Sequence, residues 1–487
     1  MKLNSNNSAL YYSLKKQSPV VDFKSATLTG QAPDGGLYFP KEIPKYNADD
    51  ISCLLELGVE EIAFRVMQPY TEGSLPEHIL AEVVKETFNF PIPLKKINDD
   101  VYVLELFHGP TQAFKDVGAR FMSRCLRYFA RDISRPVTVL VATSGDTGGA
   151  VAHGFHGVEG IRVVILYPSR KVSPVQEKQL TTLGKNILAI EVEGNFDDCQ
   201  RLVKQAFSDQ ELRSRVFLTS ANSINVARWL PQQVYYFLTL QQWIQTRAIH
   251  SGKTSLHHSG NDAFASEHYP PDKSKFIRNR EAGKPRQSID FNDAPVISVP
   301  SGNFGNICAG LLAQASGLPV KHFIAACNKN DTVPRFLQTG VYQSLPAKPS
   351  LSNAMDVADP SNFIRILELF NQDSTWLSAA LSAYSIDDAT TKETITHLYN
   401  RYKYLADPHG AVGFRALEVY RKNHPDARGI FLETAHPVKF PEAYADPSLP
   451  LLPVPNVVAE IMKKQKYSVI MKPEYQHLKD LLLQVFA

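Results

Sequence analysis

The chain has 487 residues, of which 44% are apolar and 21% are charged, as is ordinary for a globular protein of about three domains. Its 52 basic and 49 acidic side chains leave a formal net charge of +3, which gives no reason to expect binding to nucleic acid or a membrane surface. The five cysteines are scattered without metal-ligand or redox spacing, and no signal peptide or membrane-spanning run is present, so we expect a soluble, cytoplasmic protein with reduced thiols.

The first 95 residues differ from the rest of the chain. They carry the turn-rich segment APDGGLYFP (32–40) and helix-like stretches such as ILAEVVKETF (79–88). We therefore predict a small N-terminal domain over residues 1–95, ahead of a catalytic body.

Short β-branched apolar runs alternate with longer helical patterns through most of the remaining chain. Such continuous apolar strands, separated by helices, indicate βαβ units in parallel sheets that are covered on both faces. The fold class is therefore α/β, with one catalytic region at 96–245 and a second at 295–487. The predicted strands are VYVLEL (101–106), VTVLVAT (137–143), RVVILY (162–167), ILAIEV (187–192), VFLTSA (216–221), VISVP (296–300), HFIAACN (322–328) and GIFLET (429–434).

The first strand–loop–helix junction of this body contains Lys115. The predicted strand 101–106 is followed by the turn HGPT (108–111), and Lys115 lies near the start of an amphipathic helix. Most lysines are solvated surface charges, but Ala113 and Phe114 beside this one are apolar. A lysine forced toward an apolar, anion-binding cleft can lose its proton and attack a carbonyl group.

A second junction, VTVLVATSGDTGGAVAHGF (137–155), places small and polar residues between its strand and its helix. The hydroxyl groups and flexible backbone of this loop suit a carboxylate or a phosphate at the start of the helix. Asp146 argues against a polyphosphate site, because it puts negative charge where the anion would lie. Ordinary helix capping by Ser144, Asp146 or Thr147 is the alternative interpretation.

Residues 246–294 interrupt the alternation of strands and helices. The segment is polar and has no sustained apolar period, so we predict a surface insertion. Its tail, KSKFIRNREAGKPR (273–286), has six basic residues against one acidic residue. A solvated loop explains this composition better than nucleic-acid binding does.

The third junction, VISVPSGNFGNICAGLLAQASG (296–317), is the most informative. A buried-type strand ends at Pro300, and an Ala/Leu-rich helix begins near Asn306. Gly302 and Gly305 permit close backbone approach, so that amide N–H groups can converge on an anion at the positive end of the helix. This segment alone is equally compatible with a tight turn that binds nothing. Two such loops in one chain nevertheless suggest a ligand with two separated anionic ends.

Together these segments resemble the threonine synthase family of fold-type-II pyridoxal-phosphate enzymes, a class related to the tryptophan synthase β-subunit. So many ordered matches are more specific than any single motif. The resemblance implies two parallel-sheet αβα domains and conversion of O-phospho-L-homoserine and water into L-threonine and phosphate. The matching segments are APDGGLYFP, FHGPTQAFKD, ATSGDTGGAVAHGF, SANSINVARWLPQQVYYF (220–237), VPSGNFGNICAGLL, NDTVPRFLQTG (330–340), SNAMDVADPSNFIRILELF (352–370), DPHGAVGF (407–414) and LETAHPVKF (432–440).

The resemblance also implies roles for individual residues. Lys115 carries pyridoxal 5'-phosphate covalently and moves the protons of the reaction, and Thr434 faces the pyridine nitrogen. The cofactor phosphate is held by Gly302, Asn303, Phe304, Gly305 and Asn306. The substrate carboxylate is bound by Ser144, Gly145, Asp146 and Thr147, and the substrate phosphate by Asn225 and Arg228. Without the resemblance, Arg228 would be interpreted as a helix-surface charge and Asn225 as a helix cap.

Other functions stay open at this point. A phospholyase or dehydratase of the same fold would release a 2-oxo acid and ammonia, but the SINVAR and SNAMDV segments favour threonine formation. A Rossmann-like nucleotide-binding protein is disfavoured because no GxGxxG follows a strand and no GxxxxGK[ST] occurs. A non-catalytic protein that recruits a partner through its basic insertion is disfavoured by the intact FKD lysine.

No metal is expected. His436 is expected to shape the turn after Thr434, and Asp116 either anchors a helix or contacts a ligand.

Overall fold

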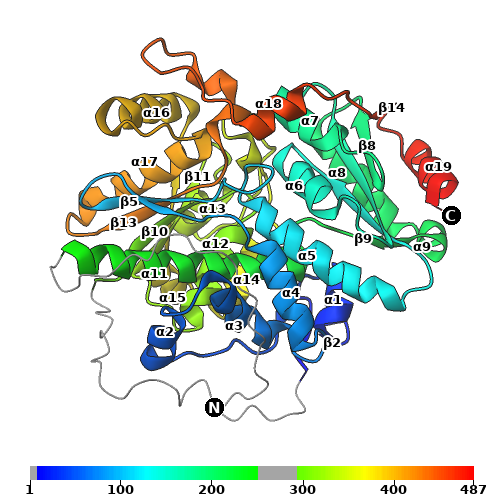
Figure 1. The fold of residues 1–487 in the computed structure, drawn as a ribbon, viewed down its shortest axis with the longest axis horizontal. Coiled ribbons are helices and arrows are strands. Elements are labelled where there is room, and N and C mark those ends of the chain that lie inside the picture. The colour runs from blue at the N-terminus through cyan, green and yellow to red at the C-terminus, as the bar shows by residue number, and fades with distance from the viewer. Residues whose placement is uncertain (1–7, 251–292, 487) are drawn as a thin grey trace.

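A computed structural model describes residues 8–250 and 293–486. In these ranges the chain forms two mainly parallel sheets with helices on both faces and a small antiparallel sheet near the N-terminus (Figure 1). The predicted insertion at 246–294 lies outside the described residues except at its two ends, the first of which completes α11 (Gln233–His250). No helix in the described ranges is both long and apolar enough to span a bilayer.

The N-terminal part packs against the catalytic body through its helices. Its sheet pairs β1 (Leu10–Ser13) antiparallel with β2 (Val21–Asp22) and with β3 (Tyr38–Pro40). The predicted helix at 79–88 is confirmed as α4, which packs on α5 as well as on α3. The helices of this part are α1 (Phe23–Thr29), α2 (Ala48–Leu54), α3 (Val59–Thr71) and α4 (Glu77–Thr87).

The larger sheet has six strands in the order β12-β11-β10-β13-β5-β4, and only β4 runs antiparallel to its neighbour. Alternate side chains of its strands face α16 (Asp388–Tyr402) and α17 (Pro408–Asn423) on one side. The other side is covered by α11 and α12 (Gly305–Ala315). The strands are β4 (Leu94–Lys96), β5 (Val101–Glu105), β10 (Val296–Pro300), β11 (His322–Cys327), β12 (Leu381–Ser385) and β13 (Gly429–Glu433).

The second sheet has five strands in the order β14-β8-β7-β6-β9. One face packs on α5 (Lys115–Phe129), α6 (Asp146–Phe155) and α7 (Pro174–Thr181). The other packs on α8 (Phe196–Ser208), α9 (Gln210–Arg215) and α19 (Tyr475–Phe486). The strands are β6 (Val137–Ala142), β7 (Ile161–Pro168), β8 (Ile187–Val192), β9 (Phe217–Thr219) and β14 (Val469–Met471).

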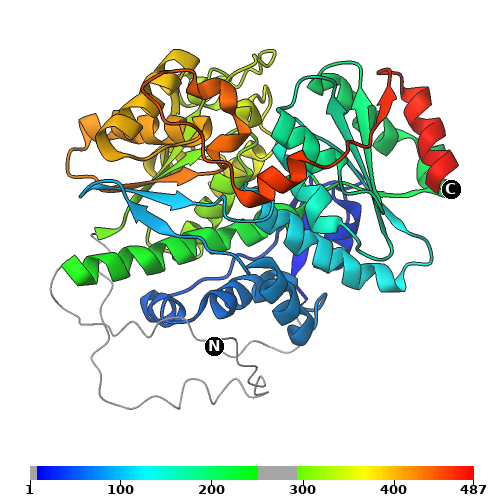
Figure 2. The same ribbon diagram turned by 45° about the horizontal axis from the view of Figure 1, so that its top comes forward.

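All eight predicted strands are present, but the two sheets do not coincide with the segments 96–245 and 295–487. Strand β5 lies in the first segment and pairs with β13 of the second. Strand β14 lies in the second segment and pairs with β8 of the first, where the C-terminal chain crosses between the sheets (Figure 2). Parallel pairing depends on matching apolar faces and not on closeness in the chain, so each sheet combines strands from both segments.

The remaining helices are short and connect or cover these layers. They are α10 (Val226–Trp229), α13 (Thr332–Thr339), α14 (Phe363–Leu369), α15 (Ser374–Ala380) and α18 (Asn456–Met462).

Candidate active site

Strand ends bring the predicted site segments together. Strands β5, β13 and β10 are parallel neighbours, so their carboxyl ends meet at one edge of the sheet. The loop after β5 leads to Lys115, Thr434 follows β13, and the glycine loop 302–306 follows β10. From the second sheet, the start of α6 reaches the same place, because Asp146 contacts Lys115.

Lys115 is the first residue of α5, and its side chain is 15% exposed. Its Nζ lies 4.6 Å from the centre of the Phe114 ring and 3.6 Å from Asp146 Oδ2. Backbone contacts fix this turn, since Phe114 N donates to Thr434 O at 2.9 Å and Tyr235 Oη donates to Phe114 O at 2.5 Å. Burial, helped by the charges of Lys439 and Arg228, lowers the pKa of Lys115 although Asp146 opposes the shift.

Asp146 lies between two lysines. Lys439 Nζ, which is fully buried, is 2.5 Å from Asp146 Oδ1, and Gln176 Nε2 donates to the same oxygen at 3.0 Å. Burial would raise the pKa of Asp146, but Lys439 and Lys115 hold it well below its usual range. Its carboxylate would repel the carboxylate of a ligand, so a ligand carboxylate at this loop would have to be bound by the backbone N–H groups at the start of α6. Lys439 and Gln176 were not among the predicted site residues.

Thr143, which was not one of the predicted capping residues, closes the loop that precedes α6. Its Oγ1 accepts hydrogen bonds from Gly145 N at 2.9 Å and from Gly148 N at 2.8 Å. Gly145 has a φ of 136°, a conformation that favours glycine, and the Gln176 side chain packs where a Cβ would lie. Thr143 and Gln176 therefore fix the backbone of the segment from Ser144 to Thr147 at the start of the helix.

Arg228 is buried in the protein and not on a helix surface. Its side chain is 3% exposed, and neither Nε nor Nη1 has a hydrogen-bond partner in the described residues. Burial lowers its pKa to about 10, so it remains a cation at neutral pH. A buried cation with open N–H groups is costly unless an anion satisfies it, which supports an anion site here.

Asn225 is also buried, but its amide is used by the protein itself. Its Nδ2 donates to Thr27 O at 2.8 Å and to Ser220 O at 3.1 Å, and its Oδ1 accepts from Ala227 N at 3.0 Å. Asn225 thus caps α10, the helix that carries Arg228. Contact between Asn225 and the substrate phosphate stays a prediction.

The glycine loop after β10 is held tightly from outside. Phe304 has a φ of 59°, and α12 begins at Gly305, within one residue of the predicted start. A Cβ on Gly302 would lie 2.7 Å from Met355 Cα, so only glycine fits there. Asn303 O accepts from Asn362 Nδ2 at 3.0 Å.

Asn306 offers an open donor at the start of α12. Tyr236 Oη donates to Asn306 Oδ1 at 2.8 Å, whereas Asn306 Nδ2 is buried and lacks a hydrogen-bond partner in the described residues. An open buried amide at a positive helix end suits a phosphate oxygen. These residues therefore fit the phosphate of pyridoxal 5'-phosphate, at the same sheet edge to which the loop after β5 brings Lys115.

Residues of the DPHG and HPVKF motifs form hydrogen bonds next to the loops of the site. Asp407 Oδ1 accepts from His409 Nδ1 at 2.6 Å, and His409 Nε2 accepts from Ala354 N at 3.2 Å, next to the residue that contacts Gly302. His436 Nδ1 accepts from Val438 N at 3.1 Å, which confirms that His436 shapes the turn after Thr434. Asp116 anchors the loop before its own helix, because Oδ1 accepts from Thr111 Oγ1 at 2.6 Å.

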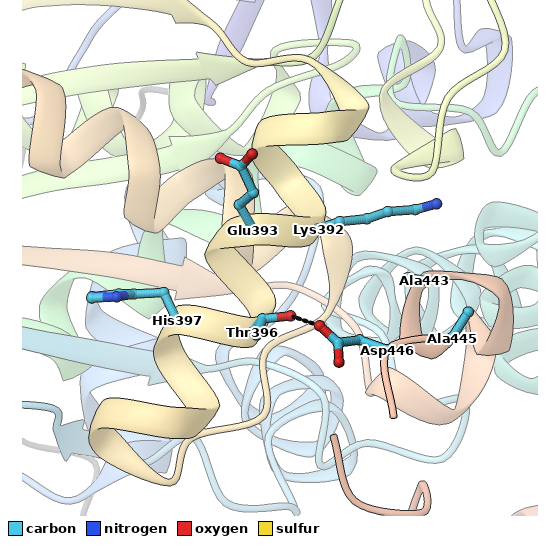
Figure 3. Close-up of a pocket in the computed structure, with 7 residues that line it drawn as sticks. All are labelled: Lys392, Glu393, Thr396, His397, Ala443, Ala445 and Asp446. Carbon is cyan, nitrogen blue, oxygen red and sulfur yellow. Dashed lines mark hydrogen bonds between the residues drawn. The ribbon is translucent and has the colours of Figure 1, made fainter. Parts of the chain in front are cut away.

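A surface hollow of about 590 Å³ lies elsewhere, between α16 and the chain at 443–446 (Figure 3). Its charged side chains, Lys392 and Glu393, point in different directions, and Asp446 accepts a hydrogen bond from Thr396 Oγ1 at 3.0 Å. None of the predicted site residues lines this hollow. It is therefore not the candidate active site.

Three family models match the chain: "Threonine synthase N terminus" at residues 10–88, "Pyridoxal-phosphate dependent enzyme" at 86–242 and "Threonine synthase, C-terminal" at 410–482. The threonine synthase of Serratia marcescens is 42% identical over 448 residues, which cover 92% of this chain and 93% of that protein. The threonine synthase of Escherichia coli K12 is 41% identical over 449 residues with the same coverage.

Solved structures show the same likeness in three dimensions. The crystal structure of threonine synthase from Escherichia coli has a TM-score of 0.83 and 40% identity, and it covers 98% of this chain and 100% of that one. The structure of PLP-bound threonine synthase from Brucella melitensis has a TM-score of 0.83 and 31% identity, with the same coverage. The fold, the lysine at the sheet edge and these relatives agree: the chain belongs to the threonine synthase family of pyridoxal-phosphate-dependent enzymes.

Proposed function

We propose that this protein converts O-phospho-L-homoserine and water into L-threonine and phosphate. The observation that carries the proposal is a buried lysine with a lowered pKa, Lys115, close to a buried arginine with two open nitrogens, Arg228. The first group suits covalent attachment of an aldehyde cofactor and proton transfer. The second suits a phosphorylated substrate. Family membership supports the same reaction.

In this proposal the cofactor is held at three points of the chain. Lys115 would bond to its aldehyde carbon, the loop Gly302–Asn306 would hold its phosphate, and Thr434 would face its ring nitrogen. When bound, pyridoxal 5'-phosphate supplies a ring that accepts the electrons left at the substrate Cα. The hydroxyl group of Thr434 is neutral, so it would be a weaker electronic partner for this nitrogen than a carboxylate.

Lys115 would transfer protons, and Arg228 would bind the substrate phosphate. As a free amine, Lys115 would take the Cα proton of the substrate, because burial favours its neutral form. After passing that proton on, it is also the group placed to take the Cβ proton before the γ-phosphate leaves. Water then adds at Cβ, and protons return to Cα and to the terminal carbon, which gives threonine. Arg228 binds that phosphate through its planar fork and stabilises its charge on departure. The backbone at Ser144–Thr147 orients the substrate carboxylate.

The proposed setting is the cytoplasm. All five cysteines are unpaired, and four of them are buried. Free thiols are typical of a reducing compartment, where amino-acid biosynthesis takes place.

Product analysis with O-phospho-L-homoserine tests the reaction directly. The purified holoprotein should release threonine and phosphate in equal amounts, and Lys115→Ala should release neither. Formation of 2-oxobutanoate and ammonia in place of threonine would assign the chain to the phospholyase or dehydratase reaction. Arg127→Ala, which removes a half-exposed arginine paired with Glu86, serves as the control variant.

A further inference from the structure

We propose that Lys439 is a positioning residue that acts as the fixed cation of the active site. By pairing with Asp146, it releases Lys115 from the role of counter-ion and keeps that lysine available as a free amine. The inference rests on the proposed role of Lys115 as the lysine that carries the cofactor.

Lys439 lies closer to the carboxylate of Asp146 than Lys115 does. Lys439 Nζ lies 2.5 Å from Asp146 Oδ1, whereas Lys115 Nζ lies 3.6 Å from Asp146 Oδ2. Lys439 also donates to Thr111 O at 3.0 Å and is completely buried. Lys439 is therefore the closer and more fully bonded partner of Asp146.

The charged groups around Lys115 come from four elements. Lys439 follows β13, Arg228 lies on α10, Asp146 begins α6, and Asp116 lies on α5 beside Lys115 itself. Asp116 is bonded to Thr111, and the hydroxyl group of Tyr235 is bonded to Phe114 O. With Lys439 and Arg228 both charged, a third positive charge at Lys115 is the least favourable charge in the cluster.

Removing the Lys439 ammonium should favour the protonated form of Lys115. Asp146 would then have Lys115 as its nearest cation, and the repulsion from Lys439 would be gone. Both changes favour the ammonium form of Lys115, which cannot attack an aldehyde. Attachment of the cofactor should therefore require a higher pH, and the defect should vanish once the pH is high enough to deprotonate Lys115 in every variant.

The experiment measures how fast the apoprotein takes up pyridoxal 5'-phosphate between pH 6.5 and 10, from the absorption of the bound cofactor. For Lys439→Met we expect the pH midpoint of the uptake rate to rise by about one unit, so that uptake at pH 7.5 is about tenfold slower. Near pH 10 the rates of variant and wild type should converge. Lys439→Met/Asp146→Asn removes the anion as well and should return the midpoint toward that of the wild type.

Two controls separate this role from a structural one. Lys466→Met also removes a lysine bonded to two carboxylates, those of Glu177 and Glu191 at 2.6 Å each, and should leave the midpoint unchanged. Lys439→Arg retains the charge and should keep a midpoint near that of the wild type. If Lys439→Met does not fold by circular dichroism, Lys439→Gln is compared in the same way.

An unchanged pH midpoint in the folded neutral variant, Lys439→Met or its replacement Lys439→Gln, would overturn the proposed role of Lys439. A loss of rate by the same factor at every pH would overturn it as well. Borohydride reduction of the loaded wild type distinguishes this from failure of the proposed function. If the trapped cofactor is on a lysine other than Lys115, it is the proposed function that fails.

Discussion

Arg228 and Asn306 carry buried N–H groups that no part of the described chain satisfies. A buried donor left unpaired costs about 1–3 kcal/mol, and more when it is charged. Such groups persist at functional sites because a ligand completes them. At both positions the missing partner is an acceptor, which agrees with the two phosphate groups that the proposed reaction brings together.

Arg228→Gln should weaken substrate binding far more than cofactor binding. A hydrogen bond between charged groups contributes about 1.5–3 kcal/mol, so KM for O-phospho-L-homoserine should rise by about 10- to 150-fold. Steady-state kinetics and a cofactor titration give the two quantities. An equal loss of affinity for substrate and cofactor would contradict the assignment of Arg228 to the substrate phosphate.

The glycine loop after β10 depends on the 3₁₀ turn Asn353–Met355 that packs against it. A Cβ on Gly302 would lie 2.7 Å from Met355 Cα and 2.9 Å from Ala354 O, and backbone atoms cannot move aside as a flexible side chain can. Gly302→Ala should therefore distort the loop at a cost of about 1–3 kcal/mol and weaken cofactor binding by about tenfold or more. Equilibrium titration of the apoprotein with pyridoxal 5'-phosphate measures this loss.

Gly58→Ala is the matched control for this element. Gly58 has a φ of −71°, and no atom lies within 4 Å of the position that a Cβ would take. This substitution should leave cofactor affinity unchanged. Wild-type affinity in Gly302→Ala would show that the loop does not bind the cofactor phosphate.

Local patterns predicted the elements and their junctions well. The strands at 101–106, 137–143 and 296–300 were recognisable because β-branched runs are buried on both faces, and the loops that follow them contain the predicted residues. Lys439 could not be found in this way. It contacts Asp146 from 293 positions further along the chain, and neither local spacing nor hydrophobic period records a contact of that separation.

The alternative interpretation of Arg228 failed for a related reason. Its sequence neighbourhood is that of an ordinary helix, and only tertiary packing buries the side chain. The resemblance to a family placed Arg228 in the site, where local physics alone favoured a surface charge. For Asn225 the local interpretation as a helix cap describes the contacts in the structure.

At the scale of the whole molecule, Arg365 of α14 joins the N-terminal part to the loop between β9 and α10. This arginine is fully buried, and it donates to Tyr38 O at 3.1 Å and to Ser223 O at 3.1 Å. Each sheet also combines strands from both catalytic segments. The site therefore depends on the assembly of the full chain, which explains why boundaries drawn on the sequence do not separate the sheets.

Acid should destabilise the folded protein through buried histidine. Burial lowers the pKa of His153 to about 4, below the ordinary value of 6.5. The unfolded chain therefore binds a proton more readily as the pH falls from 6.5 to 4, and folding stability is lost across that window. At pH 4.5 the loss is about 2 kcal/mol relative to pH 7.

His153→Gln should remove this dependence on pH. Urea-induced unfolding at pH 7 and 4.5 gives the two free energies, and the wild type should lose about 2 kcal/mol more than the variant. The exposed His78→Gln serves as the control. Equal losses in wild type and His153→Gln would show that His153 is not held neutral in the fold.

The most direct test of the account locates the cofactor on the chain. Holoprotein reduced with borohydride and digested should yield one modified peptide, with the phosphopyridoxyl mass on Lys115. The same mass on a different lysine, or no modified peptide at saturating cofactor, would contradict the assignment of this sheet edge as the active site.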